Sequence, residues 1–148
     1  MKESSLSEIT LRKYERPYQL NKRELAKKVC LSFGLLQEGD SRDIVVDILL
    51  ALLEAKNKKQ DIDLKEIKTK VIEIRKKANL ELKGIADSNI RRQLKRLRDF
   101  FIVEKINNNY RITEFLTIKE IFSEKMEKFY IKSIIERIKE YLEQLDSQ

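Results

Sequence analysis

Residues 88–105 read SNIRRQLKRLRDFFIVEK, and their pattern guides the interpretation of the whole chain. The apolar side chains recur at i, i+4, i+7 and i+11, which is the period of one helix face. They are Ile90, Leu94, Leu97 and Phe101. The pattern predicts a helix that begins at Asp87 or Ser88 and ends near Phe100, with this apolar face in the core.

The residues after this helix favour a β-hairpin. Residues 102–106 are rich in β-favouring side chains, and residues 107–109 are three asparagines, which tolerate the left-handed backbone of a turn. Residues 110–113 then predict the returning strand. A helix that leads directly into a hairpin is therefore expected over residues 87–113.

Two more helices are predicted before it. Residues 41–55 are apolar nearly all round, so neighbouring elements must cover this helix on several sides. Its polar residues form one narrow stripe of Asp43, Asp47 and Glu54, and Asp40 or Ser41 is expected to cap it. The loop at residues 57–60 follows.

A short strand at residues 61–64 is predicted to lead into the next helix. Asp63 is the expected N-cap, with Glu66 three residues on in a capping box. The other side of this helix is mostly Lys and Arg. Its apolar face is expected to comprise Ile67, Val71, Ile74 and Ala78.

This order of three helices and a hairpin over residues 41–113 resembles the winged helix-turn-helix family of DNA-binding regulators. The resemblance is strongest over residues 88–105. One departure is the link at residues 78–87, which is longer than the tight turn of the simplest helix-turn-helix. The resemblance implies a mainly α fold with a small β-hairpin, in which the last helix reads double-stranded DNA and the hairpin is the wing.

The chemistry of the last helix fits that role. Turning its apolar face inward points basic and amide side chains outward; Arg can grip guanine edges bidentately, and Asn or Gln can grip adenine edges. The expected base-reading residues are Asn89, Arg92, Gln93 and Arg96. The expected phosphate contacts are Ser88, Arg91, Lys95, Lys68, Lys70, Lys105 and Arg111.

The distribution of charge points the same way. The chain carries a net charge of +7, and residues 41–113, with 18 basic and 11 acidic groups, hold the whole excess. Such a local positive field favours polyanions. The competing interpretation is a solvated, Lys-rich surface of the kind common in thermophiles, although a codon bias toward AT-rich DNA gives a similar composition.

The flanking segments are expected to be helical arms, residues 1–40 and residues 114–148. Residues 4–14 form a weak helical pattern, and Asn21 with Glu24 predicts the start of a helix that stops at Gly34. The C-terminal arm has apolar residues at the 4-3-4-3 spacing of a coiled coil, which packs between two chains of a homodimer or on the chain's own helices. These dimerisation candidates are Ile131, Ile135, Ile138, Leu142 and Leu145.

Composition narrows the function further. The chain has no His, one Cys and no Gly-rich phosphate loop, so we expect no enzyme, no metal and no cofactor. No apolar run suggests a membrane span or signal peptide, which predicts a cytoplasmic protein. The favoured function is a homodimeric, sequence-specific transcriptional regulator with half-sites ~34 Å apart. The alternative is a winged-helix module for protein–protein contacts in a larger, nucleic-acid-processing assembly.

Overall fold

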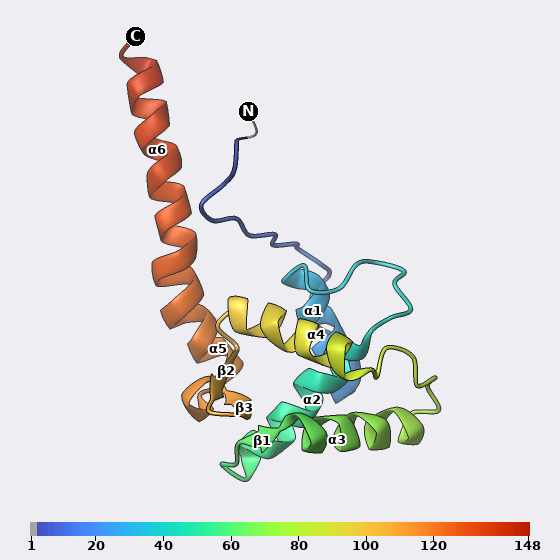
Figure 1. Ribbon diagram of the computed structural model, residues 1–148. Coiled ribbons are helices and arrows are strands. Elements are labelled where there is room, and N and C mark those ends of the chain that lie inside the picture. The colour runs from blue at the N-terminus through green and yellow to red at the C-terminus, as the bar shows by residue number, and fades with distance from the viewer. Residues whose placement is uncertain (1–2) are drawn as a thin grey trace.

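The computed structural model describes residues 3–148 and is mainly helical with a small antiparallel sheet (Figure 1). Four helices form a body around one core. They are α1 (Lys22–Ser32), α2 (Ile44–Asn57), α3 (Leu64–Lys77) and α4 (Asp87–Asp99). The mainly α fold with a hairpin expected from the sequence is thereby confirmed at this level.

Two helices begin at the capping boxes that the sequence predicts. The side chain of Asn21 accepts a hydrogen bond from the backbone N–H of Glu24, whose carboxylate accepts one from the N–H of Asn21. Asp63 and Glu66 form the same reciprocal pair at the start of α3. Each box satisfies two backbone donors that a helix end would otherwise leave unpaired.

The sheet has three strands in the order β1-β3-β2: β1 (Ile62–Asp63), β2 (Val103–Ile106) and β3 (Asn109–Ile112). Both pairings are antiparallel. The two-residue connection Asn107-Asn108 joins β2 to β3, and Asn107 adopts a positive φ of 56°. The predicted short strand and hairpin are both confirmed, and β1 ties the start of α3 to the hairpin.

Helix α2 is the centre of the core and contacts α1, α3, α4 and β3. Its apolar residues are buried nearly all round, as its composition requires. The predicted cap at residues 40–41 is wrong, because α2 begins at Ile44 and the preceding Asp43 uses its carboxylate elsewhere. That carboxylate belongs to a buried ion network, which replaces a conventional cap.

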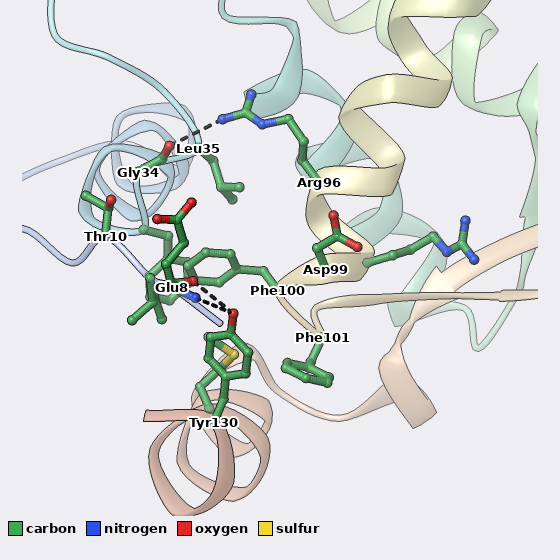
Figure 2. A pocket seen from close by; sticks show the side chains of 13 residues that line it. Glu8, Thr10, Gly34, Leu35, Arg96, Asp99, Phe100, Phe101 and Tyr130 are labelled. Atoms are coloured by element: carbon green, nitrogen blue, oxygen red, sulfur yellow. Dashed lines mark hydrogen bonds between the residues drawn. The ribbon is translucent and has the colours of Figure 1, made fainter. Parts of the chain in front are cut away.

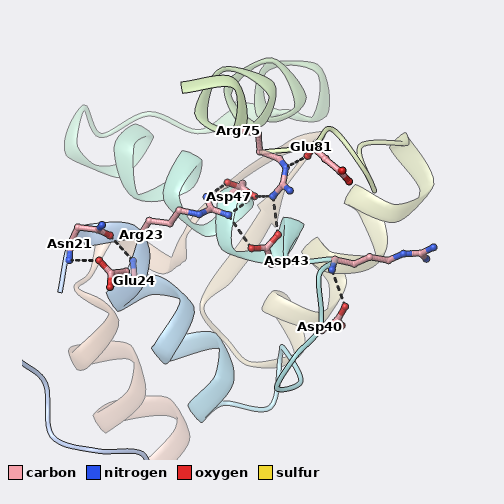
Figure 3. A network of polar contacts seen from close by, with 9 residues as sticks. Asn21, Arg23, Glu24, Asp40, Asp43, Asp47, Arg75 and Glu81 are labelled. Atoms are coloured by element: carbon pink, nitrogen blue, oxygen red, sulfur yellow. Dashed lines mark hydrogen bonds and ion pairs between the residues drawn. The ribbon is translucent and has the colours of Figure 1, made fainter. Parts of the chain in front are cut away.

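The ion network joins three helices (Figure 3). Asp47 of α2 is fully buried and pairs with Arg23 of α1 and with Arg75 of α3, whose Nη1 lies 2.6 Å from the carboxylate. Asp43 accepts from the same two guanidinium groups at 3.2 and 3.0 Å. Arg75 also donates to the backbone carbonyl of Glu81. The four charges compensate one another, which a buried ion requires.

The core face of α3 differs from the predicted one at its end. Ile67 and Val71 are buried and Ile74 is half-buried, but Ala78 is exposed. The helix ends at Lys77, so Ala78 falls beyond the last helical residue. Arg75 enters the interior one turn earlier because the acids of α2 neutralise it.

The predicted face of α4 is confirmed except at its last member. Ile90, Leu94 and Leu97 are fully buried. Phe101, however, has a positive φ of 65° just past the helix and an exposed ring. The left-handed backbone turns the chain toward β2, so Ile102 takes the core position in its place.

The helix predicted over residues 4–14 is also wrong. The segment from Glu3 to Leu20 contains no helix, and it lies across the body as an extended chain. Its hydrogen bonds go to other elements: the N–H of Arg12 donates to the carbonyl of Ser32, and the Tyr130 hydroxyl bonds both the N–H and the carbonyl of Glu8. Tertiary contacts therefore replace the bonds that a helix would supply.

The C-terminal arm is one continuous helix preceded by a single turn, η1 (Thr113–Phe115). It consists of α5 (Ile118–Ile121), the π-helical η2 (Phe122–Ile131) and α6 (Lys132–Asp146). Figure 1 shows α6 extending away from the body, and no residue of α6 is buried. Within residues 3–148, no helix combines the length and the apolar character needed to cross a membrane.

Candidate nucleic-acid interface

The outward face of α4 is basic. Its three buried residues fix the rotation of the helix, so the residues between them point to solvent. The exposed polar side chains are Ser88, Arg91, Arg92, Lys95 and Arg98, together with the acids Asp87 and Asp99. The outward orientation predicted for Arg92 and Lys95 is therefore observed, and the face presents more positive than negative charge.

Few of these positive charges are neutralised. Lys95 pairs with Asp99 one turn further on at 3.3 Å, with both side chains largely exposed. Within residues 3–148, Arg91, Arg92 and Arg98 form no ion pair. Exposed pairs such as Lys95–Asp99 are worth little, so the lysine remains available to an incoming anion.

The flank of α4 that faces α1 is organised differently. The Asn89 side chain donates to the carbonyl of Gly84 at 2.7 Å and accepts from Arg92 at 2.6 Å and from Gln93 at 3.3 Å. Arg96 donates to Gln93 at 2.8 Å and to the carbonyl of Gly34 at 3.3 Å. These bonds run as a chain from one loop to another.

This series of hydrogen bonds separates the four predicted base-reading residues into a bonded group and an exposed one. Asn89, Gln93 and Arg96 are half-buried and bonded within the protein, whereas Arg92 is exposed. The amide and guanidinium groups of the first three hold α4 against its flanking loops. The freely presented side chains lie instead on the other flank, toward the hairpin.

On that flank, α3, α4 and the hairpin line an open depression with a volume of about 580 Å³. Lys65 and Lys68 of α3, Arg91 of α4 and Lys105 of β2 all line it. Lys68 pairs with Asp87 at 3.2 Å, and the Lys105 ammonium lies 5.6 Å from the centre of the Tyr110 ring. Four cationic side chains from three elements therefore line one hollow. Two acids also line it: Asp87, which pairs with Lys68, and Asp63.

A second hollow, of about 460 Å³, continues the positive surface past the end of α4. Lys95 and Arg98 of α4 and Lys125 of η2 line it, and Lys105 borders both hollows. The hairpin therefore stands between two basic depressions. We call the seven side chains Lys65, Lys68, Arg91, Arg92, Lys95, Arg98 and Lys105 the basic face.

Two of the cations predicted to contact phosphates lie outside the basic face, whereas the uncharged Ser88 is exposed on α4 beside it. Lys70 is on another side of α3 and pairs with Glu54 at 3.3 Å. Arg111 donates twice to the Glu104 carboxylate, at 3.0 and 3.1 Å, and its guanidinium lies over the Phe115 ring. Their charges are used within the fold.

The basic face also includes two residues that sequence reasoning did not select. Lys65 is one helical step, i to i+3, from Lys68, so it shares the same face of α3. Arg98 is exposed on α4 but is not among the contacts that the sequence predicts. Helical spacing from Lys68 could have identified Lys65, whereas the approach of β2 to Arg98 depends on the tertiary fold.

A third cavity, of about 690 Å³, lies on the other side of α4 (Figure 2). The N-terminal segment, the end of α4 and η2 enclose it, with Phe100 and Phe101 below and Glu8, Arg96 and Asp99 around it. Its two cations, Arg96 and Arg98, are balanced by the two acids Glu8 and Asp99, so it shows no preference for an anion. At the edge of this cavity the Tyr130 hydroxyl donates a hydrogen bond to the backbone carbonyl of Glu8.

Across residues 3–148, no three His, Cys, Asp or Glu side chains are grouped closely enough to hold a metal ion. Cys30 is buried, and burial raises the pKa of its thiol to about 12. Comparisons with known protein families, with curated proteins and with solved structures find no match to this chain. Its function is therefore inferred from the geometry of the basic face.

Proposed function

We propose that this protein binds double-stranded DNA with the basic face and acts as a homodimeric, sequence-specific transcriptional regulator. In this proposal α4 enters the major groove, and the hairpin formed by β2 and β3 contacts the neighbouring phosphates as a wing. The single observation that carries the proposal is the convergence of cations from α3, α4 and β2 on one surface.

The order of the elements supports the winged-helix interpretation. The chain runs α2, β1, α3, α4, β2, β3, and the sheet order β1-β3-β2 places the hairpin beside the C-terminal end of α4. The contacts of β2 with α4 hold the two at a fixed distance. A rigid helix with a rigid hairpin at its end is suited to one groove and the adjoining backbone.

The exposure of the side chains refines which residues read bases. Arg91, Arg92 and Lys95 are exposed on the first half and middle of α4, and Arg is the side chain best suited to guanine edges. Asn89 and Gln93 position Arg92 and Arg96 through their hydrogen bonds. Lys65, Lys68 and Lys105 are placed to contact phosphates.

The proposal is tested by selecting bound duplexes from a random pool and measuring affinity at several salt concentrations. Arg91→Ala and Arg92→Ala are expected to weaken binding by roughly 1–3 kcal/mol each and to relax specificity at one base pair. Lys68→Ala and Lys105→Ala are expected to weaken all sequences equally, with the log–log salt slope falling by about 0.9 each.

Lys70→Ala provides the matched control, because it removes the same charge from α3 on a side that pairs with Glu54. The control should bind DNA like the parent. If Lys70→Ala weakens binding as much as Lys68→Ala, the attraction is a property of net charge and the basic face has no special role. If no duplex is enriched, the protein-interaction alternative takes its place.

A further inference from the structure

We infer that α6 pairs with α6 of a second copy of this chain in the antiparallel direction. The inference rests on the proposed homodimer and specifies its geometry. The starting observation is that residues 3–148 leave an apolar stripe of α6 uncovered: Ile135, Ile138, Leu142 and Leu145 are 47%, 52%, 50% and 68% exposed.

The stripe has the geometry of a coiled-coil seam. Its spacing of 3, 4 and 3 residues places all four side chains on one line along α6. Ile131 lies on the same line but is half-buried, so the free part of the seam begins after the π-helical η2. A second copy supplies an identical seam, which makes the surface self-complementary.

The charges at the two ends of α6 select the direction of pairing. The last turn contains no basic residue, although cations are favoured there by the helix dipole, and it ends in Asp146. Lys132 stands at the other end, and its partner within the chain, Glu136, is 3.8 Å away. Both residues occupy the same position of the heptad beside the seam.

In an antiparallel pair this heptad position faces its own equivalent across the seam, so Lys132 of one copy lies beside Asp146 of the other, twice per dimer. Lys139, which holds the same position midway between them, meets Lys139 of the other copy once at the centre. Ile138 then packs against Leu142, and Ile135 against Leu145. A parallel pair offers no such match within α6, because Ile134 and Tyr141 occupy the opposing position. Two attractive pairs against one repulsive pair leave a net attraction in the antiparallel arrangement, which the parallel arrangement lacks within α6.

The N-terminal segment enlarges the same surface. Ser4 to Ser7 lie beside Ile134 and Tyr141 of α6, and Leu6 is 91% exposed there. The two bonds between Glu8 and Tyr130 hold this segment in place. Leu6 and Tyr141, which is 73% exposed, therefore form an apolar border next to the seam.

Antiparallel pairing has a consequence for the DNA. The overlap centres on residue 140, so the two α5 helices stand about 60 Å apart along the pair, at 1.5 Å per residue. The basic faces of the two copies then lie at opposite ends of the paired helices. Half-sites about two turns of duplex apart are then expected, in place of the one-turn spacing favoured by the sequence alone.

The test uses the full chain without DNA and measures dimer dissociation by sedimentation. Lys132→Glu and Asp146→Lys should each weaken the dimer roughly tenfold by opposing like charges, and the chain carrying both changes should recover the parent's dissociation constant. Glu140→Lys, on the outer side of α6, is the matched control and should change nothing. Circular dichroism verifies that each variant keeps its helix.

Disulfide formation reports the direction independently. Ile138→Cys chains mixed with Leu142→Cys chains should cross-link, while Ile138→Cys alone should not, because a disulfide requires Cα atoms within about 7 Å. Self-linking of Ile138→Cys, or failure of the double charge reversal to recover the dimer, overturns the antiparallel pair. A parent chain that stays monomeric yet binds a DNA half-site overturns the pairing and leaves the proposed DNA contact intact.

Discussion

Helices α2 and α6 have 14 and 15 residues and both contain branched apolar side chains, eight in α2 and five in α6, yet only α2 is enclosed by its neighbours. Nine residues of α2 are buried, and none of α6. In α2 even the charged side chain of Asp47 is enclosed, matched by two arginines. The difference separates stability, which resides around α2, from assembly, which we assign to α6.

The largest effect is expected from breaking the ion network of α2. Asp47→Ala leaves Arg23 and Arg75 without their buried partner and should lower the free energy of unfolding by about 3–5 kcal/mol. Urea denaturation followed by circular dichroism measures it. Glu140→Ala, which removes an exposed acid from α6, should leave the urea midpoint within experimental error; an equal loss in both variants would contradict the division.

A pair of identical substitutions compares the helices directly. Leu52 of α2 is fully buried, so Leu52→Ala should cost about 2–5 kcal/mol through lost burial and the cavity left behind. Leu142→Ala should cost the monomer less than about 0.5 kcal/mol. Unfolding at concentrations where the chain is monomeric provides the measurement. A large loss for Leu142→Ala there would mean that α6 packs on its own chain.

The pH dependence sharpens the role of the network. Burial by itself raises the pKa of Asp43, but the hydrogen bond and charge of Arg75 and the charge of Arg23 outweigh it, so the pKa is lowered overall. A lowered native pKa means stability that is complete above the unfolded value of about 3.9 and is lost as the pH falls through the native value.

Denaturation between neutral pH and pH 3 should therefore show this loss in the parent, and a smaller loss in Asp43→Asn. Because the neutral amide does not titrate, the difference between the two curves isolates this carboxyl. Two curves that decline in parallel would show that Asp43 contributes nothing to acid sensitivity.

The smallest effect concerns reactivity alone. With its thiol pKa at about 12 and its side chain buried, Cys30 should not react with a thiol reagent at pH 8 until the protein unfolds. A cysteine introduced on the exposed stripe, as in Leu142→Cys, should react at once in the monomer. Prompt labelling of native Cys30 would show that the core opens more readily than its packing suggests.

The features that the sequence predicts correctly are local ones. The capping boxes at Asn21 and Asp63, the buried face of α4 and the hairpin turn each depend on residues within a few positions of one another. Local hydrogen bonding and helical period determine them, so no knowledge of the fold is required.

The features that the sequence does not predict are contacts between residues far apart in the chain. The bond between Arg75 and Asp47 spans 28 positions, and that between Arg96 and the Gly34 carbonyl spans 62. The latter contact removes Arg96 from the freely presented face, whereas the bonds of Asn89 and Gln93 join residues no more than five positions apart. One signal was available: an acid such as Asp47 in a helix covered on all sides must have cationic partners.

The bonds between Glu8 and Tyr130 also set an order of events during synthesis. The partners are 122 positions apart, so the N-terminal segment leaves the ribosome long before the residue that holds it exists. Domains form progressively as the chain emerges. The helical body therefore folds first, and a segment that is made before it is among the last to reach its place.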